Sequence, residues 1–122
     1  PVVYPGLSSF AQHRLVTDLI NTGYGYGGMF TIDCGTRERA DDLLDELQNK
    51  EDFGYIAVSL GYFDTLMSCS GVSTSSEISR EEQEKMGLSP GLIRLSIGYT
   101  GSLEKRIEQM ERAVRAVGLV KK

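Results

Sequence analysis

Residues 91–98 read GLIRLSIG, a short apolar stretch between glycines that predicts a β-strand. Because side chains alternate across a strand, one face would carry only aliphatic residues and belong to the core. The opposite face carries Arg94, whose guanidinium keeps its charge and is costly to bury without a partner. The pattern alone leaves two readings open. Arg94 either covers the exposed face of a sheet and pairs with a helix acid, or binds the carboxylate of a ligand through two hydrogen bonds. The expected core face holds Ile93, Leu95 and Ile97.

The segments on either side of this strand read as helices. After it, apolar residues spaced four and three apart predict an amphipathic helix over about 102–117. Before it, Ser79 and Glu82 have the spacing of a capping box, which predicts a short helix that Gly87 ends. The Ser- and Gly-rich stretch 68–79 is expected to be a loop. The last helix carries Leu103, Ile107, Met110, Val114 and Val117 on its apolar stripe and Gly118 at its C-terminal end.

The first half of the chain alternates helices with strands. We expect helices at about 9–21 and 37–50, each preceded by a capping Ser or Thr. MFTIDC at 29–34 predicts a strand. FGYIAVSL at 53–60 predicts another, which is apolar on both faces and therefore central in its sheet. The order of elements predicts a single α/β (α+β) domain over residues 1–122. It would be a two-layer sandwich in which a small mixed or antiparallel sheet of three to four strands has helices packed on one face.

Composition restricts the functions that this chain can have. With 122 residues, 40% hydrophobic and 25% charged, it is typical of one soluble domain. The net charge of −4 argues against nucleic acid as a partner, because phosphate binding needs a basic face. The sequence shows no apolar run long enough to span a membrane and no signal peptide, so we expect a cytoplasmic protein. Cys34 and Cys69 are expected to be reduced thiols, and with His13 as the single histidine no metal site is expected.

Three local patterns that resemble functional motifs have simpler explanations. The glycines of GYGYGG at 23–28 match G-x-G-x-x-G, but a dinucleotide site needs a strand before them and a helix after them, and here the order is reversed. A nucleophilic serine in 68–79 would need a histidine, and the chain offers only His13. The carboxylates at 41–46 and 81–84 fit solvated helix faces. Arg94 remains the strongest local candidate.

Several longer motifs follow one another in a fixed order along the chain. They run from VVYPGL at 2–7 through GYGGMFTID at 25–33 and AVSLGYFDTL at 57–66 to EEQEKMGLSPGLIRLSIG at 81–98. Together they resemble the C-terminal domain of the Cys/Met-metabolism enzymes that depend on pyridoxal 5′-phosphate (PLP) and share fold-type I, and most of all the methionine γ-lyases among them. The resemblance implies that a cofactor-binding N-terminal domain, with the lysine that forms the Schiff base, lies outside these residues.

The resemblance also implies substrate-binding roles for three residues. Arg94 matches the arginine that binds the substrate α-carboxylate, Ser59 matches a serine that helps to hold the same group, and Thr74 matches a threonine near that site. The implied cofactor is PLP, and the implied substrate is a sulfur-containing amino acid. No residue of this chain is expected to be catalytic or to bind the cofactor, because none of its lysines lies in a Schiff-base motif. These lysines are Lys50, Lys85, Lys105, Lys121 and Lys122.

The motifs also bear on the choice of substrate. Val58 stands where cystathionine γ-lyases and γ-synthases often have glutamate, which favours methionine. The resemblance therefore implies α,γ-elimination of methionine to 2-oxobutanoate, ammonia and methanethiol by the full-length enzyme, usually a homotetramer, with the 122 residues alone inactive. Departures from the family pattern at 10–11, 74–76 and 100–101 leave the identity of the substrate open, and two alternatives remain. One is a cystathionine γ- or β-lyase or cystathionine γ-synthase; the other is a freestanding, non-enzymatic domain that binds amino acids or a partner protein.

Overall fold

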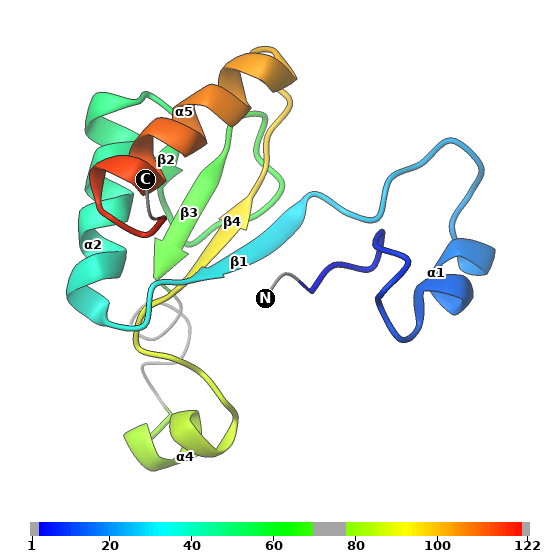
Figure 1. The fold of residues 1–122 in the computed structure, drawn as a ribbon, viewed down its shortest axis with the longest axis horizontal. Helices are drawn as coiled ribbons and strands as arrows, with labels where there is room; N and C mark the ends of the chain where they lie inside the picture. Colours follow the sequence, from blue (N-terminus) through cyan, green and yellow to red (C-terminus); the bar gives the residue numbers. More distant parts are fainter. Residues whose placement is uncertain (1–2, 70–77, 121–122) are drawn as a thin grey trace.

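A four-stranded sheet in the order β1-β4-β3-β2 forms the centre of the molecule. The structure is a computed structural model that describes residues 3–69 and 78–120, arranged as in Figure 1. Strand β4 pairs antiparallel with β1 and β3, whereas β2 pairs parallel with β3, so the predicted small mixed sheet is confirmed. The strands are β1 (Met29–Asp33), β2 (Tyr55–Ile56), β3 (Leu66–Cys69) and β4 (Leu92–Ser96).

Strand β4, formed by the GLIRLSIG stretch, lies in the interior of the sheet and alternates as predicted. Ile93 and Leu95 are fully buried in the core, and Arg94 lies on the opposite face. Ile97 was expected on the core face too, but it follows the end of the strand and is 37% exposed. Gly91 precedes the strand at a close approach of two backbones: a Cβ there would lie 2.6 Å from the carbonyl oxygen of Thr36. Glycine therefore sets how tightly β4 enters the sheet.

Two helices, α2 and α5, cover one face of the sheet, as Figure 1 shows. Helix α2 (Arg37–Asp45) continues as the single π-helical turn η1 (Glu46–Lys50), and together they fill the range predicted for one helix. Helix α5 spans Leu103–Ala116. The buried core between the layers comprises Cys34, Ala40, Leu43, Leu44, Leu47, Phe53, Met67, Cys69, Ile93, Leu95 and Ala113.

The ends of these helices are capped, and the caps at Thr36 and Gly118 were predicted. The Thr36 hydroxyl accepts the N–H of Arg39 at 3.4 Å, and the Ser102 hydroxyl accepts the N–H of Lys105 at 3.2 Å. Gly118, just beyond α5, has a φ of +67°, as expected for a glycine that ends a helix. The apolar stripe predicted for α5 is only partly right. Met110, Val114 and Val117 pack against the core, whereas Leu103 and Ile107 are 71% and 51% exposed.

Helices α1 and α4 lie away from the two layers (Figure 1). Helix α1 (His13–Leu19) is shorter than the predicted 9–21 and follows Gln12, so the serines at 8 and 9 do not cap it. Its apolar residues do not enter the core: Leu15 and Leu19 are 56% and 77% exposed. Packing of helices on one face therefore holds for α2 and α5 but not for α1. None of the described helices is long and apolar enough to span a membrane.

The short helix α4 (Arg80–Lys85) begins with the predicted capping box. The carboxylate of Glu82 accepts the Ser79 N–H at 3.1 Å, and the Ser79 hydroxyl accepts the Glu82 N–H at 3.3 Å. Gly87 follows the helix with a φ of +71°.

Two predictions for the middle of the chain are wrong. Of residues 53–60, only Tyr55–Ile56 form a strand, and this strand lies at the edge of the sheet rather than at its centre. The neighbouring interior strand is β3, whose Ser68 and Cys69 had been assigned to the loop 68–79. All four residues of β3 are buried, because the chain after β2 crosses the outer face of the sheet while α2 covers the inner face.

Candidate functional site

Arg94 lies on the outer face of the sheet, which we define as the face opposite α2 and α5. In the sheet register it stands between Thr31 of β1 and Ser68 of β3. Directly opposite residues of antiparallel strands share a face, so these two small polar side chains flank the arginine. Strand β4 thus carries a permanent positive charge at the middle of the sheet, with short neighbours that leave it room.

The chain that follows β2 crosses over this arginine. The Nη2 group of Arg94 donates to the carbonyl oxygens of Val58 at 3.0 Å and Ser59 at 3.3 Å. Next to it, the N–H of Gly61 donates to the Ser96 hydroxyl at 3.2 Å. These bonds join residues 58–61 to β4, which brings together two of the three predicted substrate-binding residues, Arg94 and Ser59.

The hydrogen-bonding capacity of Arg94 is only partly used. Its Nε atom is buried and has no hydrogen-bond partner, and no ion pair joins Arg94 to an acidic side chain within residues 3–69 and 78–120. The predicted alternative, a pair with a helix acid, is therefore not seen in these residues. Asp41 of α2, for example, accepts from Arg37 at 2.7 Å. An uncompensated guanidinium with a spare donor suits an anion, and a planar carboxylate in particular.

The other two predicted substrate-binding residues are Ser59, which the structure describes, and Thr74, which it does not. Ser59 is exposed, and its carbonyl oxygen rather than its hydroxyl contacts Arg94. Thr74 lies outside the residues that the structure describes. Both roles remain predictions.

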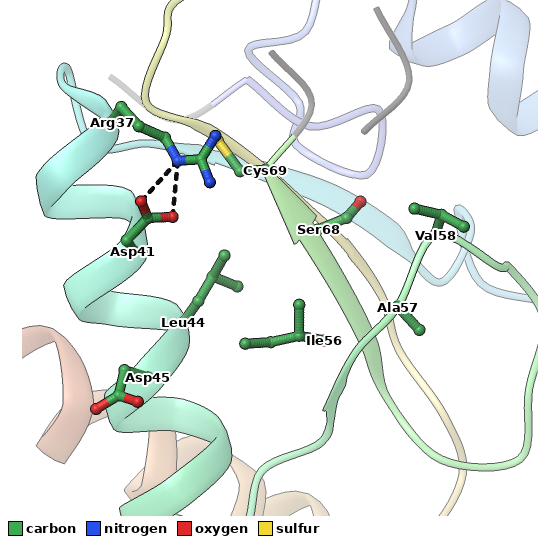
Figure 2. A pocket seen from close by; sticks show the side chains of 9 residues that line it. All are labelled: Arg37, Asp41, Leu44, Asp45, Ile56, Ala57, Val58, Ser68 and Cys69. Atoms are coloured by element: carbon green, nitrogen blue, oxygen red, sulfur yellow. Dashed lines mark hydrogen bonds and ion pairs between the residues drawn. The ribbon is translucent and has the colours of Figure 1, made fainter. Parts of the chain in front are cut away.

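A hollow of about 510 Å³ opens between α2 and the chain that leaves β2 (Figure 2). Its apolar wall includes Leu44, Ile56 and Val58, and the ion pair of Arg37 with Asp41 lies at its border. Neither Arg94 nor Ser59 lines it, and its arginine is already neutralised by a carboxylate. This hollow therefore borders the candidate carboxylate site at Val58 but does not contain Arg94.

The glycine-rich motif that resembles a dinucleotide site has a structural role. GYGYGG joins α1 to β1, as predicted from the order of its neighbours; Gly23 and Gly27 have positive φ, and the Gly28 carbonyl accepts the N–H of Ile97 at 2.7 Å. Within the described residues, no group of three or more His, Cys, Asp or Glu side chains is placed to hold a metal.

The cysteines are buried and form no disulfide. Burial raises the pKa of the Cys34 thiol, and the negative charge of Asp33 raises it further, so this thiol is neutral. The described lysines do not resemble a buried cofactor lysine either: Lys50, Lys85 and Lys105 are exposed. These residues therefore do not fit the cofactor itself, whereas Arg94 fits a carboxylate.

Sequence reasoning missed one cluster, formed by Asp64, Thr100 and Arg106 at the base of the segment that crosses Arg94. Asp64 and Arg106 form an ion pair at 2.9 Å, with side chains only 19% and 16% exposed. Asp64 lies far along the chain from Thr100 and Arg106, and no local pattern connects the three residues. The one available signal was a basic residue in the first turns of a helix, where acidic residues are favoured.

Comparison with known proteins shows which family this chain resembles. The chain is 53% identical over 112 residues to the methionine gamma-lyase of Arabidopsis thaliana, an alignment that covers 92% of this chain and 25% of that protein. It is 34% identical over 114 residues to the cystathionine gamma-lyase of Bacillus subtilis, covering 93% of this chain and 28% of that protein. The chain thus spans about a quarter of the length of these relatives.

Solved structures agree on the fold. A putative O-acetylhomoserine (thiol)-lyase from Campylobacter jejuni, which carries a pyridoxyl-lysine phosphate, matches with a TM-score of 0.75 and 28% identity, over 92% of this chain and 25% of that one. A cystathionine gamma synthase from Xanthomonas oryzae, in complex with cystathionine, matches with a TM-score of 0.74 and 25% identity, over 95% and 28% of the two chains. Residues 1–115 match the family described as Cys/Met metabolism PLP-dependent enzymes. The chain belongs to this family, and the predicted α/β fold and PLP dependence of the family are confirmed.

Proposed function

We propose that these residues form the C-terminal, substrate-carboxylate-binding domain of a PLP-dependent carbon–sulfur lyase that acts on methionine. The observation that carries the proposal is Arg94, a guanidinium on the outer face of the sheet with a spare Nε donor and no acidic partner in the described residues. A lyase of this kind converts methionine and water to 2-oxobutanoate, ammonia and methanethiol.

In this proposal Arg94 binds the α-carboxylate of methionine and so fixes the orientation of the amino acid. Bound PLP withdraws electrons from the substrate during bond cleavage. The orientation of the substrate determines which bond at the α-carbon is aligned for cleavage, so a carboxylate held by two parallel hydrogen bonds contributes to the rate as well as to binding. The exposed Ser59 and the residue Thr74 would complete the carboxylate site.

The cofactor and its lysine would belong to the rest of the full-length protein, since the described lysines are exposed on the surface. We therefore expect residues 1–122 alone to be inactive towards methionine, even with PLP added. We further propose that the full-length protein is a cytoplasmic homo-oligomer, of four chains as in its family.

A cystathionine lyase or synthase is the second candidate, because the chain is also 34% identical to a cystathionine gamma-lyase. Val58 favours methionine. Its side chain is apolar and 60% exposed beside Ser59, where it presents no charge to the polar distal end of cystathionine.

Product analysis of the full-length protein tests the proposal. The purified protein is incubated with methionine or with cystathionine, and methanethiol, 2-oxobutanoate and cysteine are measured. Release of methanethiol from methionine, with a higher kcat/KM than for cystathionine, is the expected result. The reverse preference would assign the protein to the cystathionine enzymes. Inactivity towards both substrates, with PLP bound, would reject a lyase function.

A further inference from the structure

Residues 53–64, which we call the excursion, carry the contacts to Arg94. The chain enters it at Phe53, forms the two-residue strand β2, crosses the outer face at 58–61 and returns at Asp64 to begin β3. Its middle buries little side-chain surface, because Val58, Ser59 and Leu60 are all exposed, and it is joined to β4 by hydrogen bonds to Arg94 and Ser96. The position of this middle part therefore depends on how firmly the two ends of the excursion are fixed.

The exit of the excursion is fixed by Asp64. Its Oδ1 atom accepts three hydrogen bonds, from the N–H of Thr65 at 2.8 Å, the hydroxyl of Thr100 at 2.7 Å and Nη2 of Arg106 at 2.9 Å. Burial by itself would raise the pKa of Asp64, but the hydrogen bonds from Thr100 and Thr65 and the charge of Arg106 outweigh it, so the pKa lies below its ordinary value. Asp64 is thus a carboxylate that the structure holds in its charged form.

Close backbone packing fixes the exit further. A Cβ at Gly98 would lie 2.4 Å from the carbonyl oxygen of Phe63, and the N–H of Tyr99 donates to that same oxygen at 3.0 Å. The exit therefore lies directly against the chain that follows β4 and has little freedom to shift.

The entry of the excursion is fixed by the same arginine that binds Asp64. Nη1 of Arg106 donates to the carbonyl oxygens of Phe53 at 2.6 Å and Asp52 at 3.2 Å, and its guanidinium carbon lies 5.5 Å from the centre of the Phe53 ring. Its Nε donates to the carbonyl of Thr100 at 3.0 Å. A single partly buried guanidinium therefore ties the entry of the excursion, its exit and the start of α5 together.

We propose that Arg106 is a positioning residue for the candidate carboxylate site: by fixing both ends of residues 53–64, it sets where the carbonyl groups of Val58 and Ser59 hold the guanidinium of Arg94. The inference rests on the proposed function, because it assigns Arg106 a role through Arg94. Arg106 itself lies at the base of the excursion, and its hydrogen bonds are with backbone carbonyls, Asp64, Thr100 and Gln109 rather than with any group at the crossing.

The test is a double-mutant cycle in the full-length enzyme, with Arg106→Gln, Arg94→Lys and the combination. Arg106→Gln is expected to raise KM for methionine about tenfold and to change kcat less than about twofold, because it misplaces a binding group and leaves the reacting groups intact. In the Arg94→Lys background the same substitution is expected to raise KM less than about twofold, since the guanidinium that it positions is already gone.

Arg112→Gln is the matched control, because Arg112 lies on the same helix as Arg106. The substitution removes an ion pair of 2.7 Å with Glu51, which lies outside the excursion. Its KM is expected to equal that of the parent. If Arg106→Gln does not fold, Asp64→Asn replaces it in the cycle under the same criteria, because it removes the charge at the exit alone.

The outcomes separate the two hypotheses. Equal effects of Arg106→Gln on KM in both backgrounds, or a parental KM for Arg106→Gln, would overturn the role of Arg106. A parental KM for Arg94→Lys would instead remove Arg94 from the site and, with it, the proposed carboxylate-binding function.

Discussion

Replacing Arg94 by alanine in the full-length enzyme removes the charged donor group from the outer face of β4. In the structure, Nη2 is already engaged by the carbonyls of Val58 and Ser59, and Nε is the donor that has no partner in the described residues. A bound carboxylate would take Nε and share Nη2, which gives one full and one partial charge-assisted hydrogen bond.

These contacts determine the expected magnitude. A hydrogen bond to a charged group contributes about 1.5–3 kcal/mol, so one full and one shared bond together contribute about 2–4 kcal/mol. At 1.36 kcal/mol for each factor of ten, Arg94→Ala should lower kcat/KM for methionine by roughly 30- to 900-fold, mainly through a higher KM. Arg94→Lys keeps the charge but loses the planar fork, so we expect a loss between those of the parent and the alanine variant.

The assay is the initial rate of 2-oxobutanoate formation over a range of methionine concentrations, with bound PLP measured by its absorbance to show that each variant is loaded. Circular dichroism checks the fold, because Arg94→Ala also removes two hydrogen bonds to residues 58–59. A loaded, folded Arg94→Ala enzyme whose kcat/KM falls by less than about threefold would refute the reasoning, since the predicted contacts cannot be worth so little.

Three further predictions concern the stability of the 122-residue chain, followed by urea unfolding. Gly98→Ala should lower the free energy of unfolding by about 2–3 kcal/mol through overpacking against Phe63 and Asp64, whereas Gly25→Ala, whose added Cβ would meet nothing within 4 Å, should change it by less than about 1 kcal/mol. Because the folded pKa of Asp64 is lowered, its stabilising effect is complete above the ordinary aspartate pKa of about 4 and is lost as the pH falls through the lowered value; the difference between the chain and its Asp64→Asn variant should shrink over that acidic range and stay constant near neutral pH. Ser102→Ala should cost about 1 kcal/mol by removing the cap of α5, and an unchanged free energy would show that the bond to the Lys105 N–H contributes nothing.

Strong local patterns account for what could be predicted from the sequence. Strand β4 has strict alternation, α5 has a regular spacing of apolar residues, and the caps Thr36, Ser79 and Gly118 are local signals that need no knowledge of the rest of the chain. Arg94 stood out for the same reason, as one charge in an apolar strand. The roles of Ser59 and Thr74 had no such signal and came only from the resemblance.

Elements that depend on distant packing could not be predicted. FGYIAVSL is apolar on both faces, which fits a central strand, but the chain divides it between the edge strand β2 and the crossing of the outer face. Because β2 pairs with β3, β3 is an interior strand, and the crossing covers Ser68 on its outer face while the core covers Cys69. Arg106 was missed because several of its acceptors are backbone carbonyls, which no side-chain pattern reveals.

The segment that crosses Arg94 carries exposed apolar residues, and the relatives of this chain are about four times longer. Leu60, Tyr62 and Phe63 are 52%, 47% and 46% exposed on the crossing segment, and Tyr99, whose N–H is bonded to Phe63, is 84% exposed. Apolar groups gathered on one face mark a surface that another part of a protein covers. In the proposed function that part is the cofactor-binding domain, which has to approach this face because the α-carboxylate on Arg94 must lie within one amino-acid length of PLP. In that proposal the apolar residues and the arginine have one explanation: the apolar residues would bring the two domains together, and Arg94 would bind the substrate between them.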